Sequence, residues 1–388
     1  MKQIPPVDLT RQYKHIEAEA SVAVLDLLKS GRYIGGEAIA TFEQKFADYI
    51  GVAECVSCNS GTDALFLALK ALGLGKGDEI ITTSFSFFAT AEVISRVGAK
   101  PIFVDLDRAT FNLDLAQIER AITPRTKAIL PVHLFGQPVD MTRLMAIAKK
   151  HNLYVIEDCA QATGATWGRE KIGSIGHIGC FSFFPTKNLG ACGDGGAATT
   201  NDPALARQMR ILKEHGSPSR YRHDFIGINS RLDAVQAIIL TIELRYLDYW
   251  NEQRQKAANY YRELLQTVAS IELPQTTAGG TSVWNQYTIR IAESSSKNGN
   301  NSGDRRELVR QLLSDKGIVS MIYYPIPLHL QPVYRDLGIK QGQLPIAEQT
   351  ALEVLSLPIF PDISDAEQEQ VAYALKDSLF EVSARFSC

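Results

Sequence analysis

Short apolar runs alternate with helical patterns between residues 50 and 200. Seven runs have the length and composition of strands: Cys55–Cys58, Glu79–Thr82, Pro101–Val104, Ala128–Val132, Tyr154–Glu157, Gly179–Phe183 and Gly196–Thr200. Most are apolar at nearly every position, as in a parallel sheet that is covered on both faces. Helices are predicted between several of them, at Asp63–Leu72, Ala89–Val97, Leu115–Ile122 and Met141–His151. The alternation predicts an α/β domain with right-handed crossovers between its strands.

The pattern changes after Thr200. A helix is predicted at Pro203–Glu214, and a long helical stretch from Leu232 to Arg262 would bridge two domains. Beyond it the elements are typical of an α+β domain: a strand at Tyr287–Ile291, an exposed mobile loop at Ser294–Gly303, and helices at Arg305–Lys316 and Asp365–Phe380. We therefore predict a large domain over residues 1–246 and a smaller C-terminal domain over residues 247–388.

Composition and charge narrow the classes of partner. The chain has 388 residues, of which 45% are apolar and 21% charged, and its net charge is -3. Lysine and arginine are scattered, which argues against a nucleic-acid or anionic-membrane surface. No apolar run is long enough to span a bilayer, and the segment from Met1 to Leu9 has no leader pattern. A soluble protein of the cytoplasm is the expectation.

The cysteines predict no site of their own. Six cysteines are too few for a disulfide scaffold. Cys55 and Cys58 have CxxC spacing, but zinc would need a second close pair, and the others are dispersed. Both residues lie on a predicted buried strand, which favours a role in the core. No metal site is predicted.

The segment Ser57–Leu65 passes from a predicted strand through a turn of small residues into an amphipathic helix. Backbone N–H groups at such a helix start favour a phosphate group. Gly61 lets the backbone approach a ligand closely, and the hydroxyl groups of Ser60 and Thr62 add donors. An ordinary helix N-cap explains the same residue types, so this segment alone leaves both interpretations open.

Asp158 and Lys187 each follow a predicted strand. Ligands of open α/β sheets bind beyond the carboxyl ends of the strands. A carboxylate at Asp158 can therefore hold a cationic ring nitrogen, although a helix cap is an alternative role. Lys187 follows two phenylalanines and a proline, which suggests partial burial, and burial makes a lysine amine more nucleophilic. A surface lysine beside a turn is the alternative.

These three segments together predict a site for pyridoxal 5'-phosphate (PLP). A PLP site needs a Schiff-base lysine, a partner for the pyridinium nitrogen and a phosphate anchor. Asp158 would keep the pyridine nitrogen protonated. Lys187 would form the covalent link to the cofactor aldehyde and, once displaced, would shuttle a proton.

The chain resembles the DegT-type sugar aminotransferases, a branch of the fold-type-I PLP enzymes. The motifs that carry the resemblance are Ser60–Leu65 (SGTDAL), Glu157–Gln161 (EDCAQ), Ser182–Gly190 (SFFPTKNLG) and Gly227–Asp233 (GINSRLD). The similarity extends from Gly31 to Ile359. It implies a large domain with a mostly parallel seven-stranded sheet and a smaller α+β C-terminal domain.

The resemblance also implies roles around the cofactor ring. Lys187 looks like the Schiff-base lysine and Asp158 like the pyridinium partner. Gln161 looks like the residue beside the phenolic oxygen of the ring. Phe87 matches the position whose aromatic ring stacks on PLP, whereas the neighbouring Phe85 and Phe88 are expected in the core.

For the phosphate group, the resemblance implies Gly61, Thr62 and Ser182 as ligands, next to Ser60. Asn229 matches a residue that reaches the phosphate of the other subunit's cofactor. Active sites in this family lie at a homodimer interface, so a homodimer with shared sites is implied. The implied cycle moves an amino group from an amino acid, usually glutamate, to the cofactor and then to a keto sugar.

The resemblance favours a 3-keto sugar. The sequence Asn-Ser-Arg-Leu-Asp at Asn229–Asp233 and the segment Tyr324–His329 are similar to those of enzymes that aminate a 3-keto sugar. Two substrates compete: UDP-2-acetamido-2-deoxy-3-oxo-glucuronate and a dTDP-linked 3-keto-6-deoxyhexose. Phe184 favours the uronate, because deoxyhexose enzymes tend to carry tyrosine there.

Four side chains are candidates for contact with the sugar: Arg231, Tyr323, Tyr324 and His329. Arg231 can pair with a uronate carboxylate in a bidentate fork, although an interface salt bridge explains it equally well. Tyr323 departs from both groups of relatives, where histidine is common, and this leaves the sugar contacts open. His329 also fits a solvated or capping role.

Two other classes of function are weighed against the aminotransferase. A non-catalytic regulatory protein is expected to have lost the lysine or the aspartate, and both are present. A PLP-dependent sugar dehydratase shares the fold, but the dehydratase branch carries histidine in place of Lys187. The sequence therefore favours transamination in amino-sugar and polysaccharide biosynthesis.

Overall fold

A seven-stranded sheet forms the centre of the larger part of the molecule in the computed structural model, which describes residues 3–291 and 302–386. In order across the sheet, the strands are β1 (Glu54–Cys58), β9 (Gly196–Thr200), β8 (Ile178–Ser182), β5 (Tyr154–Asp158), β4 (Thr126–Leu130), β2 (Glu79–Thr83) and β3 (Lys100–Val104). Within this sheet only β9 runs against its neighbours. The predicted seven strands and their mostly parallel order are confirmed.

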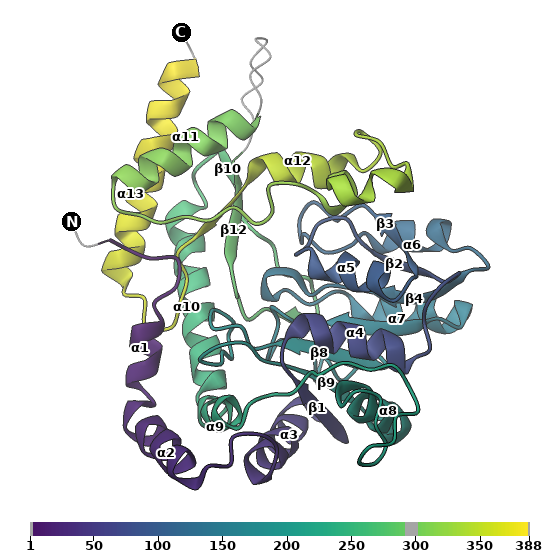
Figure 1. Cartoon of the computed structure of the whole chain (residues 1–388). Coiled ribbons are helices and arrows are strands. Elements are labelled where there is room, and N and C mark those ends of the chain that lie inside the picture. Colours follow the sequence, from purple (N-terminus) through teal and green to yellow (C-terminus); the bar gives the residue numbers. More distant parts are fainter. Residues whose placement is uncertain (1–2, 292–301, 387–388) are drawn as a thin grey trace.

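Helices cover both faces of this sheet (Figure 1). One face packs against α4 (Gly61–Ala71), α5 (Ala89–Arg96) and α8 (Pro203–Lys213). The other face packs against α3 (Glu37–Ile50), α6 (Leu115–Ala121), α7 (Met141–His151) and α9 (Ala234–Glu243). Burial on both faces explains why the strands are apolar without alternation. Cys55 and Cys58 of β1 point into the two opposite cores as free thiols, which confirms their structural role.

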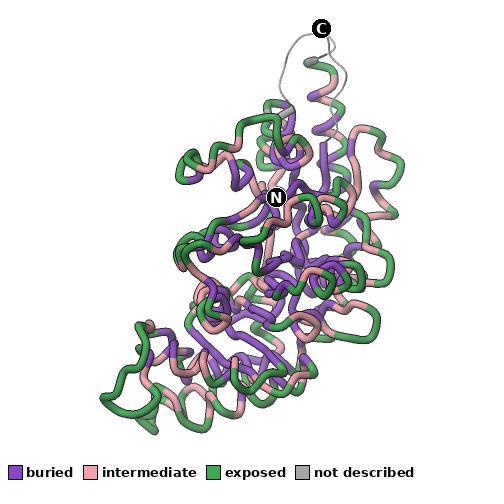
Figure 2. The backbone as a smooth tube through the Cα atoms, turned by 90° about the vertical axis from the view of Figure 1, so that its right-hand side faces the viewer, coloured by how far each residue is buried: buried purple, intermediate pink, exposed green. Residues whose placement is uncertain are grey.

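The C-terminal part has its own core. An antiparallel sheet of β10 (Ile271–Glu272), β12 (Tyr287–Ile291) and β13 (Val354–Leu357) packs with α10 (Leu247–Leu265), α11 (Ser302–Asp315) and α13 (Asp365–Phe386). The strand β13 and the preceding α12 (Pro345–Glu353) were not predicted. Figure 2 shows that buried residues are concentrated in the interior of the molecule and exposed residues on its outside. The domain boundary near residue 247 stays a prediction.

The remaining elements frame these two cores. Three short strands, β11 (Gly280–Thr281), β6 (Thr166–Trp167) and β7 (Glu170–Lys171), form a small separate sheet. Two helices, α1 (Leu9–Lys14) and α2 (Glu17–Ser30), precede α3. The 3-10 helix η1 (Leu134–Gly136) follows β4, and two more, η2 (Leu328–Leu330) and η3 (Pro332–Leu337), follow α11. None of the described helices has the length and apolar character that crossing a membrane requires.

Two sequence expectations differ from the structure. The stretch predicted as one helix from Leu232 to Arg262 is divided into α9 and α10. The chain turns there because α9 packs against the large sheet, whereas the later turns of α10 pack in the C-terminal core. Of the mobile loop predicted at Ser294–Gly303, residues 294–301 lie outside the described residues, and Ser302 already belongs to α11.

Candidate active site

A cavity of about 550 Å³ opens where β5 and β8 end, beside the start of α4. Its wall combines segments that are far apart in the sequence, and it brings together most of the predicted site residues. The predicted residues that line it are Ser60, Gly61, Thr62, Phe87, Asp158, Gln161, Ser182, Lys187, Tyr323 and Tyr324. Parallel strands ending at one edge explain this convergence.

Lys187 is held at the cavity by a tight turn. Its backbone N–H donates to the carbonyl oxygen of Phe184 at 2.8 Å. The next residue, Asn188, is buried, and its amide donates to Asn251 at 2.7 Å and to the carbonyl oxygen of Val283 at 2.8 Å. Burial lowers the pKa of the Lys187 amine to about 8, and the charge of Asp158 opposes that shift. About a tenth of the amine is therefore neutral and nucleophilic at pH 7.

Asp158 ends β5 and is buried at 4% exposure. The hydroxyl group of Thr90 donates to its Oδ2 at 2.9 Å, and the backbone N–H of Ala160 donates to its Oδ1 at 3.2 Å. Burial raises the pKa of this carboxyl group, while the two hydrogen bonds and Lys187 act in the opposite direction. Because the hydrogen of Thr90 is directed to Asp158, Thr90 accepts from Ser86, whose Oγ lies 2.9 Å away. The carboxylate is thus aimed and ready to accept from a cationic N–H group.

The carboxylate of Glu157, next to Asp158 in β5, holds the end of this strand in place through hydrogen bonds. The backbone N–H groups of Gly173, Ile175 and Gly176 donate to Glu157 at 3.0, 3.0 and 2.6 Å. His133 lies 3.1 Å from the same carboxylate, and both side chains are fully buried. This network satisfies the buried charge and sets the position of the neighbouring Asp158.

The start of α4 forms a cradle that fits a phosphate group. Ser60 caps the helix by accepting from the N–H of Asp63 at 3.1 Å, so the N–H groups before it remain available to a ligand. A Cβ atom on Gly61 would lie 2.7 Å from the Cβ of Ser182, which means that only glycine keeps this space open. The hydroxyl groups of Thr62 and Ser182 and the N-terminus of α4 then line the same cavity. The donors match the phosphate of PLP.

Aromatic and amide side chains complete the cavity. Phe87 lines it and is 59% exposed, whereas Phe85 is fully buried, as expected from the resemblance. The carbonyl oxygen of Gln161 accepts from the backbone N–H of Phe135 at 2.6 Å. The amide nitrogen of Gln161 donates to the hydroxyl oxygen of Tyr324 at 3.0 Å. Tyr324 comes from the C-terminal part of the chain, so the cavity lies between the two parts.

Three candidate residues are not among those that line the cavity. Asn229 is exposed. Arg231 forms an ion pair with Glu214 at 3.4 Å. His329 is fully buried and lies 3.1 Å from Glu348, in a structural pair rather than facing the cavity.

Residues that the sequence analysis missed also line the cavity: Ser86, Thr90, Asp194 and Gln286. Thr90 follows Phe87 by three positions at the start of α5, and residues with this spacing face the same side of a helix. That spacing was a usable signal. No local signal pointed to Gln286, which lies one residue before β12 of the other sheet.

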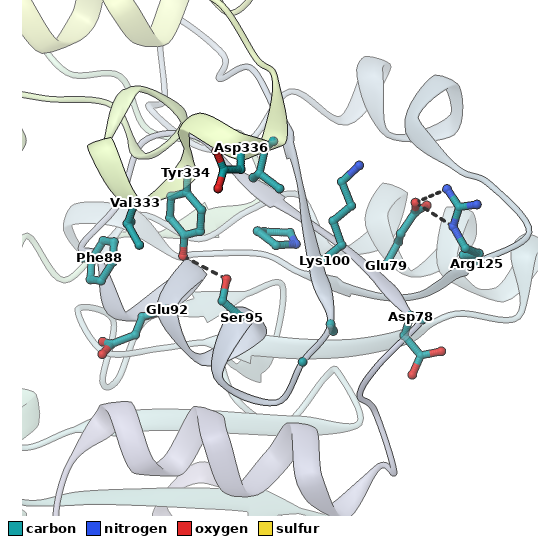
Figure 3. A pocket seen from close by; sticks show the side chains of 15 residues that line it. Asp78, Glu79, Phe88, Glu92, Ser95, Lys100, Arg125, Val333, Tyr334 and Asp336 are labelled. Atoms are coloured by element: carbon teal, nitrogen blue, oxygen red, sulfur yellow. Dashed lines mark hydrogen bonds and ion pairs between the residues drawn. The ribbon is translucent and has the colours of Figure 1, made fainter.

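Two larger hollows, each about 710 Å³, lie elsewhere. One lies between α5 and η3 at the edge of the large sheet (Figure 3). There Arg125 pairs with Glu79 at 2.6 Å, and Tyr334 contacts Ser95 at 3.4 Å. The other lies under α1 and α2 and is mostly apolar, with Glu243 at its wall. Neither combines a buried lysine, a buried carboxylate and a phosphate cradle.

Comparisons with known proteins identify the family of the chain. The model of the DegT/DnrJ/EryC1/StrS aminotransferase family matches residues 14–376. A UDP-N-acetyl-3-dehydro-alpha-D-glucosamine 3-aminotransferase of Acidithiobacillus ferrooxidans is 45% identical over 376 residues, 97% of this chain and 98% of that protein. The UDP-2-acetamido-2-deoxy-3-oxo-D-glucuronate aminotransferase of Pseudomonas aeruginosa is 40% identical over 95% of this chain and 98% of its own length. A "pleiotropic regulatory protein" of Geobacillus stearothermophilus is 46% identical over 95% of this chain and 96% of its own length.

Solved structures share the fold along the whole chain. The structure of Streptomyces venezuelae DesV in complex with a ketimine intermediate superposes with a TM-score of 0.92 at 41% identity and covers 97% of this chain and 98% of its own. The Bacillus subtilis protein NtdA, solved with bound cofactor PMP, gives a TM-score of 0.87 at 33% identity and covers 98% of this chain and 86% of its own.

Proposed function

Because the chain belongs to the DegT/DnrJ/EryC1/StrS aminotransferase family, we propose that it transfers an amino group from an amino acid, glutamate, to the C3 ketone of a nucleotide-linked sugar. The chain is a PLP-dependent sugar aminotransferase of fold type I. The observation that carries the choice of C3 is that two relatives, at 45% and 40% identity, are named for 3-oxo or 3-dehydro sugars.

The residues of the cavity divide the chemistry among them. PLP, when bound, supplies a ring that stabilises negative charge at the reacting carbon. Asp158 would keep the ring nitrogen protonated, since a buried carboxylate favours a nearby cation. Lys187 would hold the cofactor, then carry a proton between carbon atoms on one face of the ring. The cradle at Gly61, Thr62 and Ser182 would anchor the phosphate, while Phe87 would stack on the ring and Gln161 would lie beside its phenolic oxygen.

For the sugar, we propose a UDP-linked 2-acetamido-3-oxo hexose, with the glucuronate as first candidate. Both named UDP sugars carry nitrogen at C2 and an oxo group at C3. Phe184, Tyr323 and Tyr324 line the cavity, where the sugar would enter. They supply three aromatic rings and two hydroxyl groups, as sugar sites commonly do.

A homodimer with shared sites forms part of the proposal. Lys187 is the only cationic side chain among the described residues that line the cavity. A cofactor phosphate and a nucleotide diphosphate together bring several negative charges, so further polar or cationic groups are needed. Asn229 and Arg231 are accessible on the same chain but do not line its own cavity. A partner subunit that supplies Asn229 to the phosphate and Arg231 to the uronate carboxylate would complete the site.

The substrate proposal is tested by a panel of sugars. The pyridoxamine form of the protein is offered UDP-2-acetamido-3-oxo-glucose, the corresponding 3-oxo-glucuronate, a dTDP-linked 3-keto-6-deoxyhexose and a 4-keto sugar. We expect turnover of the UDP 3-keto sugars, fastest with the uronate. Turnover confined to 4-keto sugars would contradict the proposal. Loss of a sugar hydroxyl group as water, without amination, would indicate a dehydratase.

The shared site is tested by subunit complementation. Lys187→Ala and Asn229→Ala chains are mixed, unfolded and refolded together. In a mixed dimer, one cavity loses both groups and the other keeps both. With random pairing about half of the dimers are mixed, so we expect turnover and tight cofactor binding to return at about a quarter of all sites, whereas each variant alone stays impaired. No recovery in the mixture would refute the shared site.

A further inference from the structure

A tyrosine hydroxyl group from the C-terminal part of the chain closes the cavity. The ring of Tyr324 packs edge-on against Phe85, at 6.0 Å between ring centroids, and lies 6.3 Å from Phe87. Its hydroxyl oxygen lies 3.0 Å from the amide nitrogen of Gln161, and both residues line the cavity. These contacts leave the hydroxyl group little freedom to move.

The direction of this hydrogen bond follows from the backbone. The N–H of Phe135 lies 2.6 Å from the Oε1 of Gln161. A backbone N–H group can only donate, so the carbonyl oxygen of the amide must face it. The amide nitrogen therefore faces Tyr324, and an amide N–H group also only donates. Tyr324 is thus an acceptor in this bond, and its own hydrogen must point elsewhere.

We propose that Tyr324 is a directed hydrogen-bond donor to an oxygen atom of the molecule bound in the cavity. Among the residues that the structure describes, only the bond with Gln161 is found for this hydroxyl group. The proton is retained, because burial raises the pKa of Tyr324. Two sources offer a suitable oxygen: the phenolic oxygen of the cofactor and the carbonyl oxygen of the sugar. The second source rests on the proposed function, and the first does not.

A donor aimed at either oxygen acts by stabilising negative charge on it. On the cofactor it would favour the ionised phenolic oxygen. On the sugar it would polarise the ketone and then assist the departure of that oxygen as water. A hydrogen bond to a charged acceptor corresponds to about tenfold to a hundredfold in an equilibrium or rate constant.

Two variants test whether the hydrogen donated by Tyr324, and not only its aromatic ring, is needed. Tyr324→Phe keeps the ring and removes the donor. Gln161→Glu keeps an oxygen for Phe135 but presents a second acceptor to Tyr324, which draws the hydroxyl hydrogen away from the cavity. We expect both variants to lose the bond that Tyr324 donates, and Gln161→Glu to lose more, because its own carboxylate would lie beside the phenolic oxygen. The double variant should therefore lose no more than Gln161→Glu alone. Tyr154→Phe, on an exposed residue at the start of β5, is the matched control.

Three readouts identify the acceptor: the affinity for PLP, the pH titration of the bound cofactor's absorbance, and the separate rates of the glutamate and sugar half-reactions. If the cofactor oxygen is the acceptor, Tyr324→Phe weakens PLP binding about tenfold or more and shifts the titration to higher pH. If the sugar oxygen is the acceptor, both stay unchanged and only the sugar half-reaction slows by that factor.

Two results would overturn the proposal. One is a Tyr324→Phe protein that equals wild type within about twofold in all three readouts, a difference too small for a lost hydrogen bond to charge. The other is a Gln161→Glu protein that behaves as wild type while Tyr324→Phe does not. If wild type aminates none of the sugars, the proposed function has failed separately, and an unchanged PLP affinity and titration in Tyr324→Phe then overturn this proposal too.

Discussion

The hydroxyl group of Thr90 is predicted to keep Asp158 ionised, and Thr90→Val tests this. Valine has nearly the same shape, but it cannot donate the 2.9 Å hydrogen bond to Oδ2. Because Asp158 is buried, no water replaces the lost donor without rearrangement. A hydrogen bond to a charged group contributes about 1.5–3 kcal/mol. Without this bond, the pKa of Asp158, which burial already raises, would rise further.

The measurable consequence lies in cofactor binding. A carboxylate that ionises less readily holds the protonated ring nitrogen more weakly, so the affinity for PLP should fall about tenfold to a hundredfold. The assay is absorbance titration of the apoprotein with PLP and, in parallel, with its 1-deaza analogue, which has carbon in place of the ring nitrogen. Thr90→Val should weaken the binding of PLP and leave the analogue almost unaffected.

Two controls separate the loss of the hydrogen-bond donor from a change in packing. Thr90→Ser retains the donor and should bind PLP nearly as wild type does. An equal loss of affinity for PLP and for the analogue would mean that Thr90 acts only by packing. Unchanged affinity for PLP would mean that the bond from Ala160, at 3.2 Å, suffices to hold the carboxylate.

Three further predictions concern the cofactor and the stability of the fold. Lys187→Ala should lose the cofactor absorbance band that borohydride abolishes. In wild type, the rate of PLP uptake should rise about tenfold per pH unit up to pH 8 and then level off, because the reacting amine is neutral above its pKa of about 8. A rate independent of pH between 6 and 8 would refute the assignment. Gly61→Ala should weaken PLP binding by about 1–3 kcal/mol, because the added Cβ would lie 2.7 Å from that of Ser182. Gly73→Ala places its Cβ in open space, although at a positive φ that Gly61 lacks, and should leave PLP binding unchanged. Burial raises the pKa of Glu243 from 4.5 to about 8, so the folded protein holds this proton more tightly than the unfolded chain does. The stability from the protonated carboxyl group is therefore lost progressively as the pH rises from 4.5 to about 8. Glu243→Gln should therefore raise the melting temperature at pH 8.5 but not at pH 4. The gain in free energy of unfolding at pH 8.5 is at most about 5 kcal/mol. An equal effect at both pH values would contradict the assigned pKa.

The local pattern predicted the strands of the large sheet and two side chains, Asp158 and Lys187, that line the cavity. The seven apolar runs correspond to the seven strands of the large sheet within one or two residues at each end. Asp158 and Lys187 were recognisable because strand ends of a parallel sheet converge on one edge, whatever the rest of the chain does. The small residues at the start of α4 also indicated a close approach of the backbone. Gly61 lies so near Ser182 that no Cβ atom fits there.

Side-chain direction and long-range packing required the folded molecule. Residues at the two ends of a local motif can face different neighbours: Arg231 turns to Glu214, and His329 to Glu348, rather than to the cavity. The bond from Thr90 to Asp158 joins residues 68 positions apart, and the bond from Gln161 to Tyr324 joins residues 163 positions apart. Periodicity reports only which face of an element is buried, because it averages over neighbours along the chain. Which polar atom meets which, and in what direction the proton points, depends on how the separate elements pack.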